Sequence, residues 1–144
     1  MDLTIEEIER LYGVEYEGIV GPYGLPIWYD GIRKKKLSEL REDDIARLIR
    51  QDLYVDYAIE EGLKRVKDDP AGGYKVDGEI LLALAKMKKK YWLEYPALRR
   101  KAFEVILFIR VNYSVIRDDD SLMEIDKIDI YESLFEIEKN INMK

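Results

Sequence analysis

The sequence predicts an all-α fold, a single-domain bundle of about five to seven helices over residues 1–144. The main observation is the spacing of apolar residues between Leu37 and Trp92, which recur every three or four positions. Such residues form one stripe along a helix, and the stripe must be buried against a neighbour. Short turns rich in Asp, Gly and Pro separate these helical segments. A chain of this length can also bury a core without disulfides or a metal.

At the N-terminus, Thr4 and Glu7 have the spacing of a capping box, which predicts a short helix over residues 5–12. Repeated glycines and prolines between Gly13 and Gly31 interrupt any helical period, so we expect a loop there. The loop carries four aromatic residues, Tyr16, Tyr23, Trp28 and Tyr29. Disordered segments are poor in aromatic residues. The rings therefore either pack on the helical core as a lid or form a contact surface for a partner.

In the middle of the chain, the apolar spacing predicts three helices. The first begins with acidic residues, which complement the partial positive charge of a helix N-terminus. These are Glu42, Asp43 and Asp44. Asp52 is expected to cap the second helix, over residues 53–67, which ends before Pro70. Asp77 is expected to cap the third, over residues 78–89.

Two further helical regions follow. Pro96 suits the first turn of a helix that continues to about Val111. Its apolar face is widened by three residues, Phe103, Leu107 and Phe108, so we expect this helix to be central and deeply packed. Trp92, in the joint before it, is expected to be buried. After the acidic triplet 118–120 the pattern is again helical, although residues 128–131 could also alternate as a strand.

The net charge of −6 is unevenly distributed. Residues 1–30 and residues 118–144 each carry −6, and residues 31–117 carry +6. Either the acidic ends fold over the basic middle, or an acidic surface meets a basic partner. The composition does not favour direct binding of nucleic acid. An acidic N-terminus without a long apolar run is not a secretory signal, and no segment is apolar over the length of a membrane span, so we expect a cytoplasmic protein.

Catalytic chemistry has few candidates in this chain. It contains no His and no Cys, which removes the commonest general base, the commonest metal ligand and any cysteine site. It also lacks a phosphate-binding loop and a dinucleotide fingerprint. The triplet 118–120 lacks the Gly and the final Glu of an EF-hand calcium loop. We therefore expect a binding protein rather than an enzyme, without catalytic residues, cofactor or metal.

Several short segments occur in an order typical of one protein family. They are Lys36–Leu40, Ile45–Gln51, Asp69–Ala71 with Tyr74, Asp77–Leu81, Tyr91–Trp92 and Tyr95–Leu98. Over about residues 32–100 the chain thereby resembles the immunity proteins of bacterial contact-dependent growth inhibition systems. It departs from the pattern at Arg41, where a Thr cap is expected, and at Glu79, which replaces an Asp.

The resemblance implies a cytoplasmic protein that binds the C-terminal toxin domain of one cognate system, often a nuclease, and blocks it. It does not transfer toxin contacts, because members share a scaffold while each recognises a different toxin. Five residues of the shared segments are then expected in the scaffold: Gln51, Tyr74, Asp77, Gly78 and Trp92. The alternatives are a helical adaptor with a non-toxin partner and a metal-dependent enzyme that uses carboxylates. The oligomeric state stays open, with a monomer slightly favoured.

The acidic ends supply the candidate toxin-binding residues. A toxin that acts on nucleic acid needs a basic cleft, and an inhibitor can present carboxylates where phosphates would lie. Aromatic anchors would supply affinity, while the charges speed and orient the encounter. The candidates are Glu15, Glu17, Tyr23, Trp28, Tyr29, Asp118, Asp119 and Asp120. In the competing hypothesis, the rings only cover the core and the middle helices bind the toxin.

Overall fold

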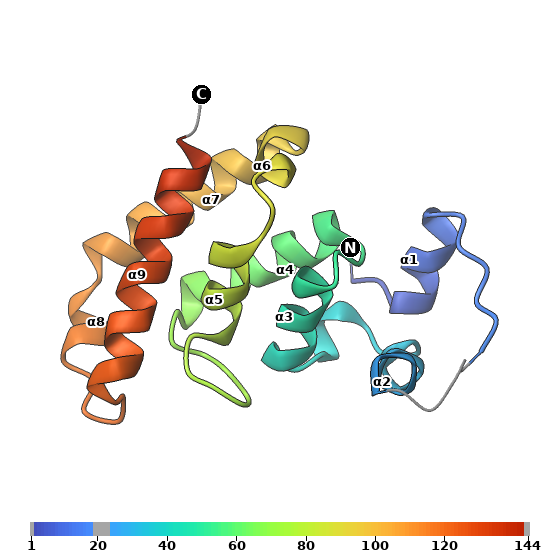
Figure 1. Ribbon diagram of the computed structural model, residues 1–144, viewed down its shortest axis with the longest axis horizontal. Coiled ribbons are helices and arrows are strands. Elements are labelled where there is room, and N and C mark those ends of the chain that lie inside the picture. Colours follow the sequence, from blue (N-terminus) through green and yellow to red (C-terminus); the bar gives the residue numbers. More distant parts are fainter. Residues whose placement is uncertain (1, 19–23, 143–144) are drawn as a thin grey trace. The chain divides into compact units, whose positions relative to one another are not determined.

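The computed structural model describes residues 2–18 and 24–142, and this part of the chain is helical (Figure 1). It contains α1 (Ile5–Leu11), α2 (Gly24–Ile32), a 3₁₀ helix (Leu37–Glu39), α3 (Glu42–Arg50), α4 (Val55–Asp68), α5 (Glu79–Lys86), α6 (Lys90–Glu94), α7 (Pro96–Val111), α8 (Ser114–Arg117) and α9 (Glu124–Ile141). The all-α prediction is confirmed. The nine α-helices of the described residues exceed the expected five to seven because α2, α6 and α8 were not anticipated.

The helices form two compact units, Met1–Leu40 and Arg41–Lys144. Each unit has its own internal contacts, and they are described separately below. The expectation that residues 1–144 make one domain stays a prediction. None of the helices in residues 2–18 and 24–142 is both long enough and apolar enough to span a bilayer.

The first unit begins with α1, whose predicted capping box is present. The Glu7 amide donates to Thr4 Oγ1 at 3.1 Å, and the Thr4 amide donates to Glu7 Oε1 at 3.0 Å. The chain returns alongside this end of the helix, where the Ile5 amide donates to the Lys35 carbonyl and the Leu37 amide to the Leu3 carbonyl. Backbone hydrogen bonds thus join the start of α1 to the segment that follows α2.

The prediction of a loop up to Gly31 is wrong, because α2 occupies Gly24–Ile32. The residues interpreted as helix breakers lie near its ends. Pro26 is the third residue of the helix, where a backbone N–H has no intrahelical acceptor, so its missing donor costs nothing. Gly31 lies next to the last residue. The aromatic residues Trp28 and Tyr29 are therefore presented by a helix.

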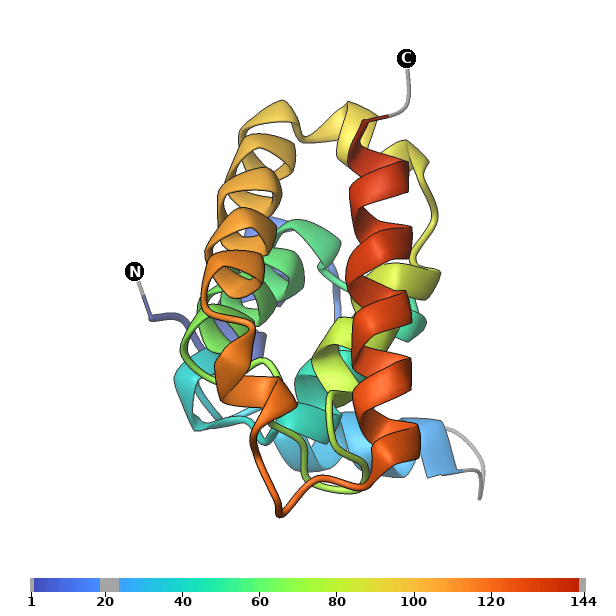
Figure 2. The same cartoon turned by 90° about the vertical axis from the view of Figure 1, so that its left-hand side faces the viewer.

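In the second unit, α5 lies between α3 and α9, and α4 and α7 form a second layer (Figures 1 and 2). The five apolar residues of α5 that face these neighbours are buried: Ile80, Leu81, Ala83, Leu84 and Ala85. Helix α4 approaches α5 at Gly62, where an added Cβ would lie 3.1 Å from Ile80 Cγ2. The core of the unit is thus centred on α5.

The N-terminus of α3 agrees with its predicted acidic start, since Glu42, Asp43 and Asp44 all lie in the first turn. Asp44 Oδ2 accepts the Arg41 amide at 3.0 Å, and both Asp43 oxygens accept the Arg41 guanidinium at 3.0 Å. Arg41, where the family pattern has a Thr cap, is therefore accommodated by the carboxylates that follow it.

The two other predicted caps are wrong. Helix α5 begins at Glu79 rather than after Asp77, because Gly78 adopts a left-handed conformation with φ of 72°. The buried Glu79 carboxylate accepts the Tyr74 and Lys75 amides at 3.1 and 3.2 Å and so fixes the preceding loop.

Asp52 does not cap α4, which begins three residues later. Its carboxylate instead accepts hydrogen bonds from Lys88 Nζ at 3.0 Å and the Tyr91 hydroxyl at 3.1 Å. These bonds hold its pKa below the ordinary value, although burial opposes them. The residue therefore joins the end of α3 to the start of α6.

Helix α7 begins at Pro96 as predicted, but the expectation that its widened apolar face is deeply packed is wrong. Ala102, Val105, Ile106 and Ile109 are buried on one side. The widening residues on the other side are exposed: Phe103, Leu107 and Phe108. The last region is one helix, α9, so the strand alternative for residues 128–131 is also excluded.

The burial of Trp92 is confirmed, since its exposed fraction is 1 %. We expect Trp92→Ala to lower the free energy of unfolding by about 3–5 kcal/mol, because a large aromatic side chain leaves a cavity. Leu93, the next residue, is 55 % exposed, and Leu93→Ala should change stability by no more than about 0.5 kcal/mol. Urea denaturation followed by circular dichroism measures both values, and equal losses would contradict this packing.

The chain contains two tryptophans, one in each unit, which allows the single-domain prediction to be tested. Trp92→Phe leaves Trp28 as the reporter of the first unit, and Trp28→Phe leaves Trp92 as the reporter of the second. In one cooperative domain, each fluorescence transition coincides with the loss of helical circular dichroism of the same variant. A Trp28 transition at lower denaturant than the loss of helix would show that the first unit unfolds by itself.

Candidate functional site

The first unit is built around the carboxylate of Glu9, a residue of α1 that is only 2 % exposed. Arg33 donates to it twice, from Nε to Oε2 at 2.9 Å and from Nη2 to Oε1 at 2.7 Å. The Tyr29 hydroxyl donates to Oε2 at 2.6 Å. The Arg33 guanidinium also lies 3.7 Å from the centre of the Tyr16 ring. We call these four residues the Glu9 cluster.

The cluster joins four segments of the first unit. Glu9 comes from α1, Tyr29 from α2, and Arg33 from the residues directly after α2. Tyr16 comes from the segment after α1, and its ring centre lies 5.9 Å from that of Tyr29. Its hydroxyl donates to Asp30 Oδ1 at 2.5 Å. The position of α2 against α1 is therefore set by polar and aromatic contacts.

The Glu9 cluster is an ion pair with both groups charged. Burial alone would raise the pKa of Glu9, but the hydrogen bonds from Arg33 and Tyr29 outweigh it, so the pKa lies below its ordinary value. The hydrogen bond to Glu9 raises the pKa of Arg33. A carboxylate held ionised by a bidentate arginine is suited to fixing structure and has no free proton to transfer.

The candidate residues of the N-terminal patch fall into two groups. Glu15 and Glu17 are exposed in the segment after α1. Trp28 and Tyr29 are half-buried on α2, with ring centres 6.4 Å apart, and the Tyr29 hydroxyl is bound to Glu9. Tyr23 lies outside the described residues. The structure thus brings an aromatic pair and exposed carboxylates into one small unit, with Tyr29 also serving its stability.

The second candidate patch, Asp118–Asp120, lies between α8 and α9 of the second unit. Asp119 Oδ1 accepts the Ser121 amide at 2.9 Å and the Ser121 hydroxyl at 2.5 Å, and these bonds lower the pKa of Asp119. Asp118 accepts from Arg117 Nε at 3.3 Å and is exposed, as is Asp120. Among the described residues, no group of three or more carboxylates is arranged to hold a metal ion.

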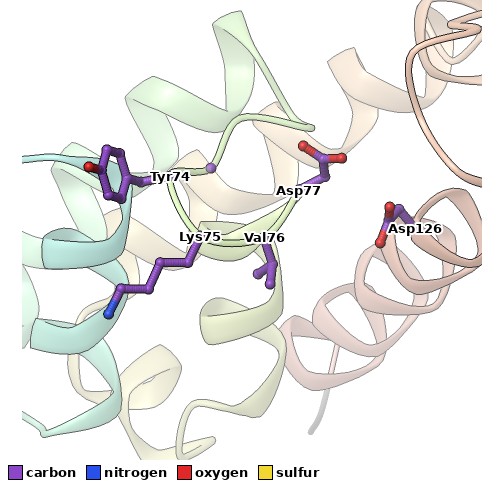
Figure 3. A pocket seen from close by; sticks show the side chains of 6 residues that line it. Tyr74, Lys75, Val76, Asp77 and Asp126 are labelled. Carbon is purple, nitrogen blue, oxygen red and sulfur yellow. The ribbon is translucent and has the colours of Figure 1, made fainter.

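Two surface hollows lie in the second unit. The first is lined by residues 73–77 and Asp126, and Figure 3 shows Tyr74 and Lys75 directed away from its carboxylates, Asp77 and Asp126. The second lies where α4 meets the joint between α6 and α7. Its polar lining residues are Asp56, Tyr57, Glu60, Glu94 and Tyr95. We call this second hollow the α4–α6 groove. In the competing hypothesis the middle helices bind the toxin, and this groove is the place on them that best suits such a contact.

The five residues expected in the scaffold differ in how deeply they are buried. Gly78 and Trp92 are buried, and an added Cβ at Gly78 would lie 2.8 Å from Ile130 Cγ1. Asp77 is half-buried. Tyr74 is exposed, and its ring lies 3.8 Å from the Arg41 guanidinium, while Gln51 is exposed at the end of α3.

Sequence reasoning missed Glu9 and Arg33, which organise the first unit. Glu9 lies between two apolar residues of a short helix, Ile8 and Leu11, and Arg33 belongs to a basic run, so each has the pattern of a solvated charge. The two residues are 24 positions apart, and no local spacing connects them. The signal in the sequence was that an acidic helix precedes the aromatic segment and a basic run follows it.

Comparison with known protein families gives a match. The family model for CDI immunity proteins, where CDI denotes contact-dependent growth inhibition, matches residues 17–102, more than half of the chain. No curated protein matches it. The matched range includes α2 of the first unit and continues to the first part of α7.

The Glu9 cluster predicts a pH-dependent loss of stability on mutation. In a Trp92→Phe background, where Trp28 reports on the first unit, Glu9→Gln should lower the free energy of unfolding by about 1.5–3 kcal/mol at pH 7. Because the folded pKa of Glu9 is lowered, the stabilisation is full above its ordinary value of 4.5 and is lost as the pH falls through the folded pKa. The difference between the two proteins should therefore begin to shrink below pH 4.5 and disappear below the folded pKa. Glu15→Gln, at an exposed position, is the control. A difference that stays constant from pH 7 to pH 3 would contradict the ion pair.

Proposed function

Because this chain belongs to the CDI immunity proteins, which neutralise a cognate CDI toxin, we propose that it acts in the cytoplasm by covering the active cleft of a nuclease toxin. The toxin domain is the C-terminal part of its protein. Inhibition on this proposal is by direct binding, without a cofactor and without catalysis by the immunity protein.

The observation that supports the occlusion mechanism is that the first unit carries exposed carboxylates together with a half-buried aromatic pair. Glu15 and Glu17 are exposed, and Trp28 on α2 is half-buried. A nuclease binds phosphates through a basic cleft, so carboxylates can occupy the positions that phosphates take. An aromatic side chain beside them supplies contact area at low cost in conformational entropy.

The Glu9 cluster supports this role because it holds α2 in place before the toxin arrives. Ordering a loop on binding costs free energy that must be subtracted from the affinity. Here the residues around Trp28 are already helical, and Tyr29, its neighbour, is bound to Glu9 at 2.6 Å. The aromatic anchor therefore has a defined position.

The second patch, Asp118–Asp120, fits the same mechanism on the second unit. Asp119 closes a turn with Ser121, which leaves Asp118 and Asp120 exposed beside it. Exposed carboxylates of this kind attract a basic partner over a distance of about one Debye length, some 8 Å at physiological salt. They would mainly affect the rate of association.

Charge reversal tests the proposed contacts. The first variant carries Glu15→Lys and Glu17→Lys, and the second carries Asp118→Lys and Asp120→Lys, which leaves the turn between Asp119 and Ser121 intact. At least one of the two variants should associate with the toxin domain encoded beside this gene at a rate lower by about tenfold or more at low salt. The same variant should show a weaker dependence of the rate on salt and an unchanged melting temperature. Stopped-flow or surface-based kinetics at several salt concentrations measures this.

The matched control is Glu60→Lys with Glu94→Lys in the α4–α6 groove, which changes the net charge by the same amount as the first variant. If only this control slows association, the middle helices bind the toxin and the assignment of the acidic ends is wrong. If the wild-type protein does not bind the toxin domain, an adaptor function with another partner replaces the proposal.

A further inference from the structure

Helix α7 has two apolar sides, and only one of them is covered. Ala102, Val105, Ile106 and Ile109 are buried. On the opposite side, Phe103, Leu107 and Val111 recur every four positions and are exposed, Leu107 at 53 % and Val111 at 76 %. A helix that needed only one buried side would carry polar residues on the other.

Helix α9 has the same organisation. Its buried side includes Ile130, Leu134 and Ile137. Its exposed side carries a row of large side chains, Ile128, Tyr131 and Phe135, with exposed fractions of 50 to 58 %.

The two rows lie on helices that contact each other. Helices α7 and α9 run side by side in the second unit (Figure 2). The Tyr113 ring, just after α7, lies 6.1 Å from the Tyr131 ring, and the Arg110 guanidinium lies 5.9 Å from it. Arg110 Nε also donates to Glu138 at 2.7 Å. We call the surface formed by the two rows the α7–α9 face: Phe103, Leu107, Val111, Ile128, Tyr131 and Phe135.

Large exposed apolar patches on soluble proteins mark interaction sites, because they favour aggregation when nothing covers them. The α7–α9 face also lies entirely beyond residue 102, where the match to the family ends. The core draws on both the matched range and the buried sides of α7 and α9, whereas the face lies wholly in the part of the chain beyond the match. A surface for one particular toxin is expected in such a part.

The charges that border the face define its partner. Asp129, Glu132 and Glu136 each follow a residue of the α9 row by one position, so they line one flank of it. Within residues 2–18 and 24–142, none of the three has a cation at salt-bridge distance. Two cations of these helices are bound within the chain, Arg110 to Glu138, and Lys127 to Glu124 and the Arg117 carbonyl.

This charge argues against a second copy of the chain as the occupant. In a symmetric dimer the same surface patch of each copy faces the other, so the carboxylates of one α9 would approach those of its partner. Juxtaposed like charges in an interface are costly. Helix α9 carries six carboxylates and two lysines, and the whole chain has a net charge of −6. The complementary surface is apolar in the middle and cationic at one edge.

We propose that the α7–α9 face is a docking surface for the cognate toxin, with the apolar rows as the anchor and the carboxylates paired with lysines or arginines of the toxin. This inference rests on the proposed function and adds the contact that retains the complex once it has formed. The Asp118–Asp120 patch lies in the turn that leads into α9. Encounter through that patch would bring the toxin to the beginning of the face.

The test is the double substitution Leu107→Ser with Phe135→Ser, which removes one exposed side chain from each row. Its matched control is Val76→Ser with Leu93→Ser, two residues exposed to a similar extent (52 and 55 %) that lie outside α7 and α9. The probe is an inactive variant of the C-terminal toxin domain encoded beside this gene. We expect the double variant to dissociate about 30-fold faster, which is the effect of losing one hot-spot contact. The association rate, its salt dependence and the melting temperature should stay as in the wild type, and the control should dissociate like the wild type.

Three results would overturn the inference. A double variant that dissociates like the wild type would show that the face does not contact the toxin, while the wild-type complex would still support the proposed function. Sedimentation that shows a wild-type dimer and a monomeric double variant with unchanged toxin binding would assign the face to self-association. A wild-type protein that does not bind the toxin would remove the proposed function and this inference together.

Discussion

The burial of α5 is the constraint on which the second unit depends. A helix of eight residues is too short to be stable alone, and this one has apolar side chains around most of its circumference. It can exist only if neighbours surround it, and α3, α4 and α9 do so. Two glycines allow the close approach, since a Cβ at Gly62 or Gly78 would meet Ile80 or Ile130 at 3.1 or 2.8 Å. The buried Glu79 then fixes the loop before α5 by accepting two of its amides.

The first unit is stabilised in a different way. A segment of 40 residues has too few apolar side chains for a large core, and units below about 40 residues usually need an additional constraint. Here the additional constraint is the buried Glu9 with its bidentate arginine and tyrosine partners. A buried ion pair contributes less to stability than its Coulomb attraction suggests, but its geometry admits few alternatives. The cluster therefore specifies where α2 lies, which the proposed role of Trp28 as an anchor requires.

Much of the fold follows from local sequence signals. The capping box at Thr4, the acidic start of α3 and the proline at the first residue of α7 each act within one helical turn, and all three are present. Helix α2 was missed because a proline or glycine breaks a helix only in its interior, and the ends of α2 could not be located beforehand. The exposed side of α7 was missed because periodicity shows that a face is apolar without showing whether a neighbour covers it.

The residues of the candidate site also fall into two groups, those predicted by local sequence and those that depend on contacts between distant parts of the chain. Charged residues in turns, such as Glu15 and Asp120, are exposed as their type predicts. The role of Tyr29 in holding Glu9 depends on a contact 20 residues away, and the α7–α9 face depends on how two helices pack, so neither is readable from local pattern. The toxin contacts are harder still, because they are defined by complementarity to a surface that this chain does not encode.

The acidic residues beside the apolar row of α9 serve both the solubility of the free protein and the recognition of a partner. Large exposed apolar side chains give strong contacts, but they also favour association of the free protein with itself. Carboxylates placed one position after Ile128, Tyr131 and Phe135 oppose contact between two copies through like-charge repulsion. The same carboxylates attract a cationic partner, so a single feature disfavours the wrong complex and favours the intended one. This dual effect accounts for the acidic flank of the α9 row, which lies on the most acidic helix of the second unit; the α7 row lies on a helix with four cationic residues and one carboxylate.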